Sequence, residues 1–265
     1  MKWRMLPIKY IDVLLLAGGK GSRLKQCGVI DLPKPLVPIQ IDGYDVPMIE
    51  NAIRGASLGV RSNLVVLTSL DPDSQSDMVE EYIQRTHPCG RISFSVEDQP
   101  LGTAGAANKA LIPRRSNIGI ISPTDTLFPF HSLGEIVAEH RRKKSKVTWV
   151  VTSRPGDGAQ NIGKILTDDN GRVIYDFEAA NAEDPKENTN KLIKMTSVGV
   201  VVTDRDYFVE QFGRYFNHGG PKVVDLYRQY IPKLLNIGET IDTFDIRQPA
   251  QDLGTVDRLN RYRRN

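Results

Sequence analysis

Apolar runs of strand length alternate with stretches of helical periodicity along the first 152 residues. Residues 13–16 form an unbroken apolar run that ends in glycines, which is typical of a strand buried on both faces. Residues 48–58 carry apolar side chains at helical spacing, and Gly59 ends the pattern. The alternation continues, and it predicts further strands at 63–68, 92–96, 118–122 and 146–152 and further helices at 76–85, 104–111 and 133–142.

This alternation predicts the fold class. Strands that are separated by single helices pair in parallel through right-handed crossovers. We therefore expect an α/β fold with a doubly wound, mostly parallel sheet flanked by helices. Ligands of such sheets bind at the carboxyl ends of the strands, so polar motifs that follow the strands are candidates for a site.

The pattern becomes richer in β structure after Ser153. Residues 163–166 and 173–177 flank an Asn-Gly turn, which predicts a hairpin, and the polar stretch 179–191 is expected to be a loop. No linker or repeat interrupts the chain, so we expect one domain over 1–265. Its core would comprise about 10–152 and 201–265, with an inserted β-rich lobe at about 153–200. The remaining elements predicted are strands at 196–202 and 241–246 and helices at 222–235 and 255–263.

Composition and charge exclude several function classes. The net charge of +3 is small for 265 residues and gives no support for a nucleic-acid-binding face. The only cysteines are Cys27 and Cys89, so neither a disulfide framework nor a cysteine zinc site is expected. The apolar run 11–17 is too short to span a membrane and lacks a signal-peptide cleavage pattern. We expect a cytoplasmic protein that does not bind membranes.

The most informative segment is LLLAGGKGSRL at 14–24. A glycine-rich turn after a buried strand allows backbone N–H groups to approach phosphate oxygens. The spacing fits neither the dinucleotide fingerprint nor the P-loop, and a glycine cluster alone could be a plain tight turn. Arg23 adds a fork of donors, and Lys34 lies between Pro33 and Pro35, which restrict its backbone. Together these residues predict a polyphosphate clamp.

The segment LAGGKGSRL followed by PKP resembles the signature of the nucleoside-diphosphate-sugar pyrophosphorylases, or sugar-1-phosphate nucleotidyltransferases. The resemblance covers about the whole chain and implies a Rossmann-like core with a sugar-binding lobe. It implies catalytic roles for Arg23 and Lys34. It further implies nucleotide contacts from the loop residues Leu16, Ala17, Gly18, Gly19, Gly21 and Ser22.

The segment EDQPLGTAG at 97–105 is similar to the base-recognition loop of this family, and it implies nucleobase contacts from Glu97, Pro100 and Gly102. Guanine presents two adjacent donors, and an ionised carboxylate accepts both. An amide side chain would suit uracil or thymine better, because it can donate as well as accept a hydrogen bond. The motif PLGTAG also resembles that of the guanylyltransferase branch that acts on mannose and manno-heptose 1-phosphates with GTP, so GTP is favoured as the nucleotide. Glu97 could instead be a solvated carboxylate at the end of a strand.

Two aspartates resemble the metal ligands of the family. Asp125 follows the strand predicted at 118–122, and Asp252 begins a D-x-G-T segment before the last helix. Mg²⁺ is commonly held by one or two carboxylates together with phosphate oxygens. On its own, Asp252 would be read as a turn residue or a helix N-cap. The family has glycine where this chain has Thr124.

The resemblance is weaker in the sugar-binding lobe. Gly163, Glu178 and Ser197 match positions that contact the sugar in the family. However, Ala179 stands where the family usually has a lysine that binds the sugar phosphate. Lys186, Lys191 and Lys194 are alternatives for that role, and the sequence does not choose among them.

The reaction that the resemblance implies is attack by a sugar 1-phosphate on the α-phosphorus of a nucleoside triphosphate, with release of pyrophosphate. The nucleophile is already an anion, so no general base is needed, and positioning and charge stabilisation would carry the catalysis. A catalytically silent sugar-nucleotide sensor and a cytidylyltransferase acting on a non-sugar phosphate remain alternatives. The sequence leaves open whether the protein is a monomer or a homo-oligomer.

Overall fold

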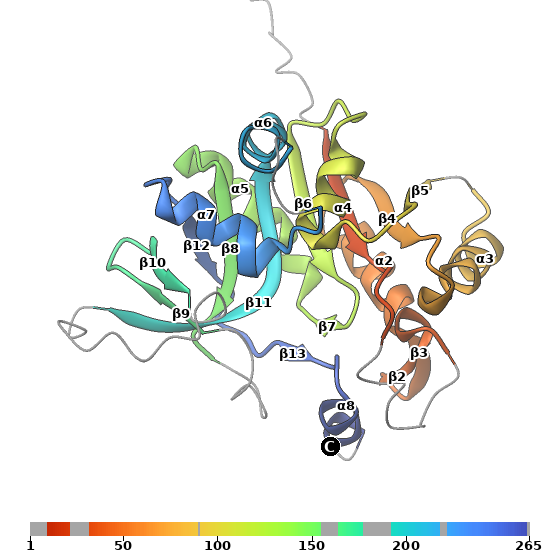
Figure 1. The fold of residues 1–265 in the computed structure, drawn as a ribbon. Coiled ribbons are helices and arrows are strands. Elements are labelled where there is room, and N and C mark those ends of the chain that lie inside the picture. Colours follow the sequence, from red (N-terminus) through yellow and green to blue (C-terminus); the bar gives the residue numbers. More distant parts are fainter. Residues whose placement is uncertain are drawn as a thin grey trace, which may run out of the picture.

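Strand β1 (Ile11–Leu16) lies at the centre of the main sheet in the computed structural model, which describes residues 10–21, 32–89, 91–154, 164–176, 192–217 and 222–263 (Figure 1). It pairs in parallel with β4 (Asn63–Ser69) and β6 (Ile118–Pro123), and β5 (Ile92–Glu97) pairs in parallel with β4. These four strands therefore bring their carboxyl ends to one edge of the sheet. This confirms the predicted α/β fold with its parallel core.

The sheet continues beyond β6 with antiparallel pairing. The long strand β11 (Ile193–Asp204) runs antiparallel to β6, to β8 (Val147–Thr152) and to β9 (Lys164–Thr167). Strand β10 (Val173–Asp176) forms the predicted hairpin with β9, and β12 (Asp242–Asp245) pairs in parallel with β8. The β-rich segment is thus continuous with the main sheet, which has nine strands in the order β10-β9-β11-β6-β1-β4-β5, with β8 and β12 branching from β11.

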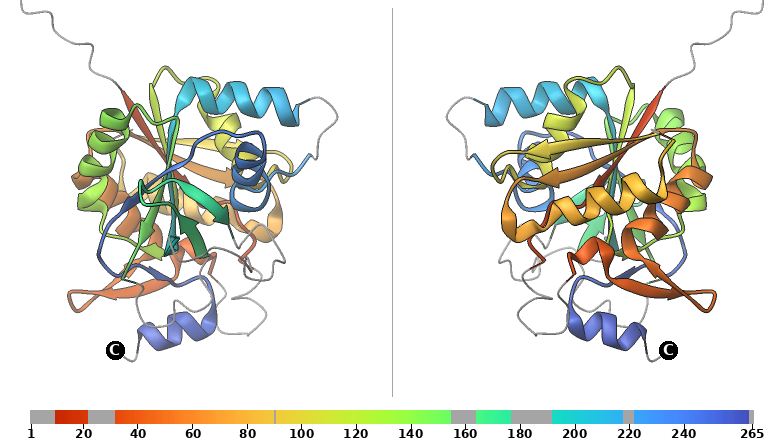
Figure 2. Two further views of the ribbon diagram at one scale, coloured as in Figure 1. Left: turned by 90° about the vertical axis from the view of Figure 1, so that its left-hand side faces the viewer. Right: turned by 90° about the vertical axis from the view of Figure 1, so that its right-hand side faces the viewer.

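Helices cover both faces of the sheet (Figure 2). Alternation along β1 sends Val13 and Leu15 into one hydrophobic core and Leu14 into another. The first core is completed by α2 (Met48–Gly59), α3 (Ser76–Thr86) and α5 (Leu133–Lys143). The second is completed by α4 (Gly102–Leu111), α6 (Arg205–Phe216) and α7 (Ile231–Asn236). None of the helices in the described part of the chain is long and apolar enough to cross a membrane.

A third, smaller core joins the C-terminal helix to a hairpin near the N-terminus. Strands β2 (Pro38–Ile41) and β3 (Tyr44–Pro47) form the hairpin, and α8 (Val256–Tyr262) packs against it. The short strands β7 (Thr126–Leu127) and β13 (Gln251–Asp252) pair antiparallel and lead into α8. The apolar side chains of this core are Val37, Ile39, Met48, Leu253 and Leu259.

The helix predicted at 222–235 is shorter in the structure, and this prediction was wrong at its start. The Asp225 carboxylate accepts hydrogen bonds from the N–H groups of Tyr227 and Arg228, each at 2.9 Å, so it caps a helix that begins at Leu226. Residues 226–230 wind as a π-helix before α7. The preceding Val224 lies outside this helix, and its N–H donates to the Leu101 carbonyl at 2.8 Å.

Four strands and one helix had no counterpart in the predicted pattern. The strands are β2, β3, β7 and β13, and the helix is α6. Helix α6 does carry a sequence signal, because Asp204 caps it through Tyr207 N–H at 3.1 Å and Phe208 and Phe212 are buried four residues apart. Short 3₁₀ helices also occur at Lys34–Leu36, Pro72–Ser74 and Phe130–Ser132.

Packing of α8 is a testable feature of this fold. Leu259 is 1% exposed in the third core, whereas Leu58 on α2 is 86% exposed. We expect Leu259→Ala to lower the free energy of unfolding in urea by about 2–5 kcal/mol, because it leaves a cavity. The matched control Leu58→Ala should change it by less than about 0.5 kcal/mol. Equal effects of the two substitutions would contradict this packing.

Candidate active site

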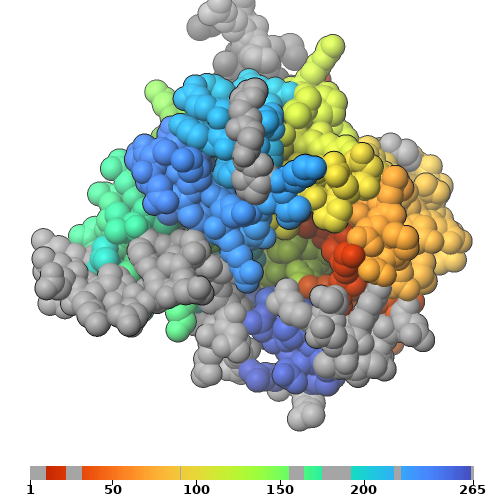
Figure 3. Space-filling view, in the orientation of Figure 1, coloured from red at the N-terminus to blue at the C-terminus, as the bar shows by residue number. Residues whose placement is uncertain are grey.

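A cavity of about 470 Å³ lies at the carboxyl ends of β1, β4, β5 and β6. It opens as a hollow near the centre of the face shown in Figure 3. Among the residues singled out by the sequence, it is lined by Leu16, Ala17, Gly18, Gly19, Gly21, Lys34, Glu97, Pro100, Gly102 and Asp125. The structure thus places the predicted phosphate, base and first metal residues around one space.

Four other predicted site residues lie outside the described residues. These are Ser22, Arg23, Gly163 and Glu178. Their roles stay predictions.

The glycine loop leaves the sheet in a fixed direction. Ala17 N–H donates to the Leu67 carbonyl at 3.0 Å, and Thr124 Oγ1 donates to the Leu16 carbonyl at 3.0 Å. A Cβ on Gly18 would lie 3.1 Å from the Thr68 carbonyl carbon, so the loop passes close against the end of β4. The start of the loop is therefore held by both neighbouring strands.

Lys34 lines the cavity and contacts a residue that follows β6. Its 3₁₀ turn is set by Pro33 and Pro35, as the sequence suggested. The Lys34 ammonium forms an ion pair with Asp125 Oδ2, and the two side chains are 18% and 17% exposed. The cation is thus held beside a carboxylate at the mouth of the cavity.

Asp252 reaches the same place from the other end of the chain. Strands β7 and β13 pair Asp252 with Thr126, and Leu253 N–H donates to the Asp125 carbonyl at 2.8 Å. The Asp252 carboxylate accepts from Gly254 N–H at 2.6 Å and forms an ion pair with Arg258 on α8. The small sheet therefore brings together two aspartates that are far apart in sequence.

Gly254 marks the point on which these charged groups converge. A Cβ built there would lie 2.7 Å from Asp125 Oδ2, 2.7 Å from Asp252 Oδ1 and 2.9 Å from Lys34 Nζ. A side chain at this position would require the ends of these three side chains to move.

The two carboxylates at this point form a donor set that suits Mg²⁺, which takes one or two carboxylates and completes its shell with phosphates and water. Within the described residues, no cluster of three or more His, Cys, Asp or Glu side chains forms a self-sufficient metal site. Two carboxylates would leave the rest of the coordination shell of a Mg²⁺ ion to phosphate oxygens and water.

Glu97 ends β5 on the opposite side of the cavity. Its Oε2 accepts a hydrogen bond from Leu101 N–H at 3.1 Å. Burial raises the pKa of the Glu97 carboxyl above its ordinary value, although the Leu101 N–H opposes this shift by stabilising the anion. The carboxylate thus pays a desolvation cost that two ligand donors would relieve.

Gly102 follows this carboxylate and has a φ of +75°, and a Cβ there would meet the Val224 carbonyl oxygen at 2.5 Å. The segment 97–105 therefore packs against the residues that precede the π-helix. Ala104 N–H completes this contact by donating to the same carbonyl at 2.9 Å.

Ser197 does not line the cavity. It lies on β11, and its hydroxyl accepts hydrogen bonds from Trp149 Nε1 at 2.9 Å and from Gly199 N–H at 3.1 Å. The side chain is buried, so in this structure it braces the sheet. Its predicted contact with a sugar stays a prediction.

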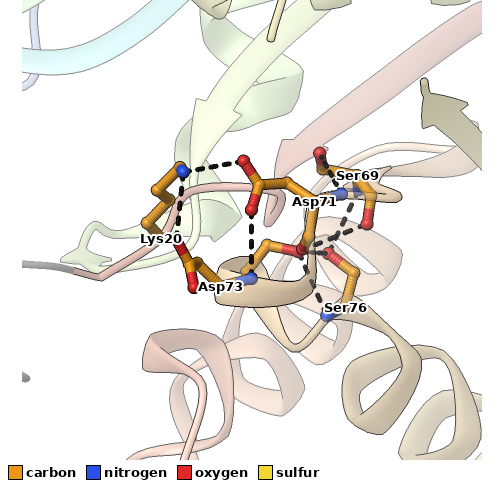
Figure 4. Close-up of polar contacts among 6 residues, drawn as sticks. Lys20, Ser69, Asp71, Asp73 and Ser76 are labelled. Atoms are coloured by element: carbon orange, nitrogen blue, oxygen red, sulfur yellow. Dashed lines mark hydrogen bonds and ion pairs between the residues drawn. The ribbon is translucent and has the colours of Figure 1, made fainter. Parts of the chain in front are cut away.

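Several residues lining the cavity were missed by sequence reasoning. Lys20 extends from the glycine loop to Asp71 (Figure 4), and Thr68 and Ser69 are the last two residues of β4. Strand 63–68 was predicted, so the rule that ligands bind at carboxyl ends of strands could have identified Thr68 and Ser69. Gly254 had a signal in the D-x-G-T segment, but its crowding depends on tertiary structure.

Several known proteins are similar to this chain in sequence. A mannose-1-phosphate guanyltransferase of Emericella nidulans is 30% identical over 146 residues, which is 54% of this chain and 37% of that protein. A D-glycero-α-D-manno-heptose 1-phosphate guanylyltransferase of Aneurinibacillus thermoaerophilus is 25% identical over 173 residues, covering 65% and 70% of the two chains. The match thus spans little more than a third of the first relative's length.

Solved structures share the fold. HddC from Yersinia pseudotuberculosis superposes with a TM-score of 0.67 at 18% identity, covering 95% of this chain and 97% of that chain. The inositol-1-phosphate CTP transferase of T. maritima gives 0.69 at 15% identity, covering 96% and 94%. The family model for nucleotidyl transferases matches residues 12–263. The chain therefore belongs to the nucleotidyl transferase family.

Proposed function

We propose that the protein joins a sugar 1-phosphate to a nucleoside triphosphate, preferably GTP, and releases pyrophosphate. The observation that carries this proposal is the convergence of Lys34, Asp125 and Asp252 on Gly254, beside a glycine loop at the carboxyl ends of the strands. Phosphate binding and charge neutralisation are thereby concentrated at one edge of the sheet. The names of the two curated relatives support the sugar phosphate and the guanine base.

The residues suit a displacement at phosphorus. A phosphate oxygen of the sugar 1-phosphate forms a bond to the α-phosphorus, and the bond from that phosphorus to the bridging oxygen of pyrophosphate breaks. Both nucleophile and leaving group are anions, so no proton has to be removed. Lys34 would neutralise charge on the phosphates, and the loop amides would hold them in place.

Asp125 and Asp252 would hold Mg²⁺, with Lys34 and Arg258 as their counter-ions in the structure. When bound, the ion supplies positive charge that stabilises the phosphates in the transition state. Positioning of the two carboxylates is the task of the β7–β13 pair and of α8.

Glu97 supports GTP as the nucleotide. Its carboxylate lines the cavity, and burial already disfavours its charge. Two guanine donors would compensate that cost, whereas a pyrimidine presents only one N–H beside an acceptor on its pairing edge. Compensation of this desolvation cost is the argument that supports guanine in our proposal.

A second candidate is a cytidylyltransferase acting on a non-sugar phosphate. The observation that favours it is Ala179, which stands where the family usually has a lysine for the sugar phosphate.

Pyrophosphate release tests these alternatives. With Mg²⁺, we expect release from GTP and a mannose-type or manno-heptose-type 1-phosphate, within a panel that also includes UTP, CTP, dTTP and ATP. Release from CTP with choline phosphate or a polyol phosphate would establish the second candidate. Nucleotide binding without release from any pair would instead indicate a sensor.

The Lys34–Asp125 pair should be essential for turnover. We expect Lys34→Met and Asp125→Asn each to lower kcat by roughly a hundredfold or more, because each removes charge stabilisation at the reacting phosphates. Circular dichroism and thermal unfolding should show a folded protein, since the cavity admits water to the remaining group. Lys146→Met serves as a control, because Lys146 pairs with Asp204 at the edge of the sheet opposite the cavity. Near-normal turnover in either pair variant would remove that residue from the mechanism.

The nucleobase role of Glu97 predicts a pH dependence. Guanine donors require the ionised carboxylate, so the KM for GTP should rise as the pH falls through the raised pKa of Glu97. We expect Glu97→Gln to raise that KM by roughly tenfold to a hundredfold at neutral pH, through loss of charged hydrogen bonds. It should also remove this part of the pH dependence. A variant that keeps both the wild-type KM and its pH profile would contradict guanine recognition by Glu97.

A further inference from the structure

The glycine loop carries a side chain whose role the proposed function does not use. Lys20 lies between Gly19 and Gly21 and is half exposed, and its ammonium pairs with Asp71 Oδ2 at 2.8 Å and with Asp73 Oδ2 at 3.2 Å (Figure 4). Lys20 and Asp71 both line the cavity, but they come from different strand ends. The ion pairs therefore connect the loop after β1 to the turn after β4.

The loop needs such a connection because of how it would bind phosphate. Within the described part of the chain, Ala17 makes the last backbone hydrogen bond from the loop, and Gly18 to Gly21 donate none to other backbone groups. Amides that bind phosphate cannot also be used in internal hydrogen bonds. A Cβ on Gly19 would meet none of the described atoms within 4 Å, so the described residues leave open space beside the loop at this position.

The turn that receives Lys20 is built as a firm anchor. Asp71 Oδ1 accepts from Asp73 N–H at 3.0 Å, and the Ser74 hydroxyl donates to the Asp71 carbonyl at 2.6 Å. Ser74 and Ser76 are buried and their hydroxyls lie 2.9 Å apart, and Ser69 N–H donates to Ser76 Oγ at 3.1 Å. The two carboxylates are thus presented from a turn that is tied to β4 and α3.

We propose that Lys20 is a positioning residue that latches the phosphate loop to Asp71 and Asp73, leaving its amides free for the triphosphate. This inference rests on the proposed function, since it assigns to the loop the phosphates of the nucleotide. The latch acts on the free protein by raising the fraction of loops that are ready to bind. Lys20 itself does not contact the phosphates.

The latch has a specific kinetic consequence. The apparent Kd of a ligand equals its intrinsic Kd divided by the fraction of binding-competent protein. Loss of the latch should therefore raise the Kd and KM for the nucleotide, while kcat at saturation and the KM for the sugar phosphate stay near wild type. Substitution of a residue needed only for folding would not raise the KM for the nucleotide while leaving kcat and the KM for the sugar phosphate unchanged.

The test compares Lys20→Met with the double variant Asp71→Asn/Asp73→Asn and with the triple variant that combines all three. Calorimetry would measure the Kd of GTP and of inorganic tripolyphosphate, which reports on the phosphate loop independently of the base. We expect each of the first two variants to bind roughly fivefold to tenfold more weakly, and the triple variant to be no worse than either. Lys20→Arg should keep most of the affinity.

The control is Lys146→Met, which breaks an ion pair with Asp204. Asp204 pairs with Ile118 at the amino end of β6, at the opposite edge of the sheet from the cavity, so this variant should bind as wild type does. Unchanged binding by Lys20→Met would overturn the latch. So would weak binding by Lys20→Met with normal or tighter binding by the double aspartate variant, because Lys20 would then contact the phosphates directly. If wild-type protein binds tripolyphosphate but no nucleotide, the proposed function fails while the latch is still measured.

Discussion

The site depends on the ion pair between Lys34 and Asp125 and on the second carboxylate, Asp252, that approaches it over Gly254. The opposite charges of Lys34 and Asp125 stabilise each other. Two adjacent carboxylates, in contrast, repel each other unless cations lie beside them. Lys34 and Arg258 supply those cations in the structure. The arrangement therefore suits the anionic substrates and the divalent ion that we propose, and its geometry follows from neighbouring backbone contacts.

Those backbone contacts explain why short elements of the fold are important for the geometry of the site. The β7–β13 pair contains two residues in each strand, yet it brings the end of the chain to the carboxyl end of β6. Helix α8 then buries Leu259 against the β2–β3 hairpin and carries Arg258 to Asp252. The hairpin also follows the turn that holds Lys34, so one small core positions both the cation and the second carboxylate.

The sequence predicted the parallel core because strand and helix periodicity is a local property, as the run 13–16 and the helix over 48–58 show. Short motifs also singled out the loop, Lys34, Asp125 and Asp252, which the structure brings together. The sequence could not reveal the β7–β13 pair, whose two-residue strands have no periodicity, or the crowding at Gly254. Lys20 was missed because its partners Asp71 and Asp73 belong to a turn that no motif connects to the glycine loop. The helix expected from 222 starts at Leu226 because the Asp225 cap overrides continued helical pattern.

The most direct measurement of the account is Mn²⁺ binding, followed by electron paramagnetic resonance with and without GTP, in wild-type protein and in Gly254→Ala. A methyl group at this position would force the ends of the Asp125, Asp252 and Lys34 side chains to move, so we predict that the variant stays folded with a weaker nucleotide-dependent metal signal and lower turnover. The same signal and turnover in Gly254→Ala as in wild type would contradict the claim that the positions of these three side-chain ends around Gly254 set metal and phosphate binding.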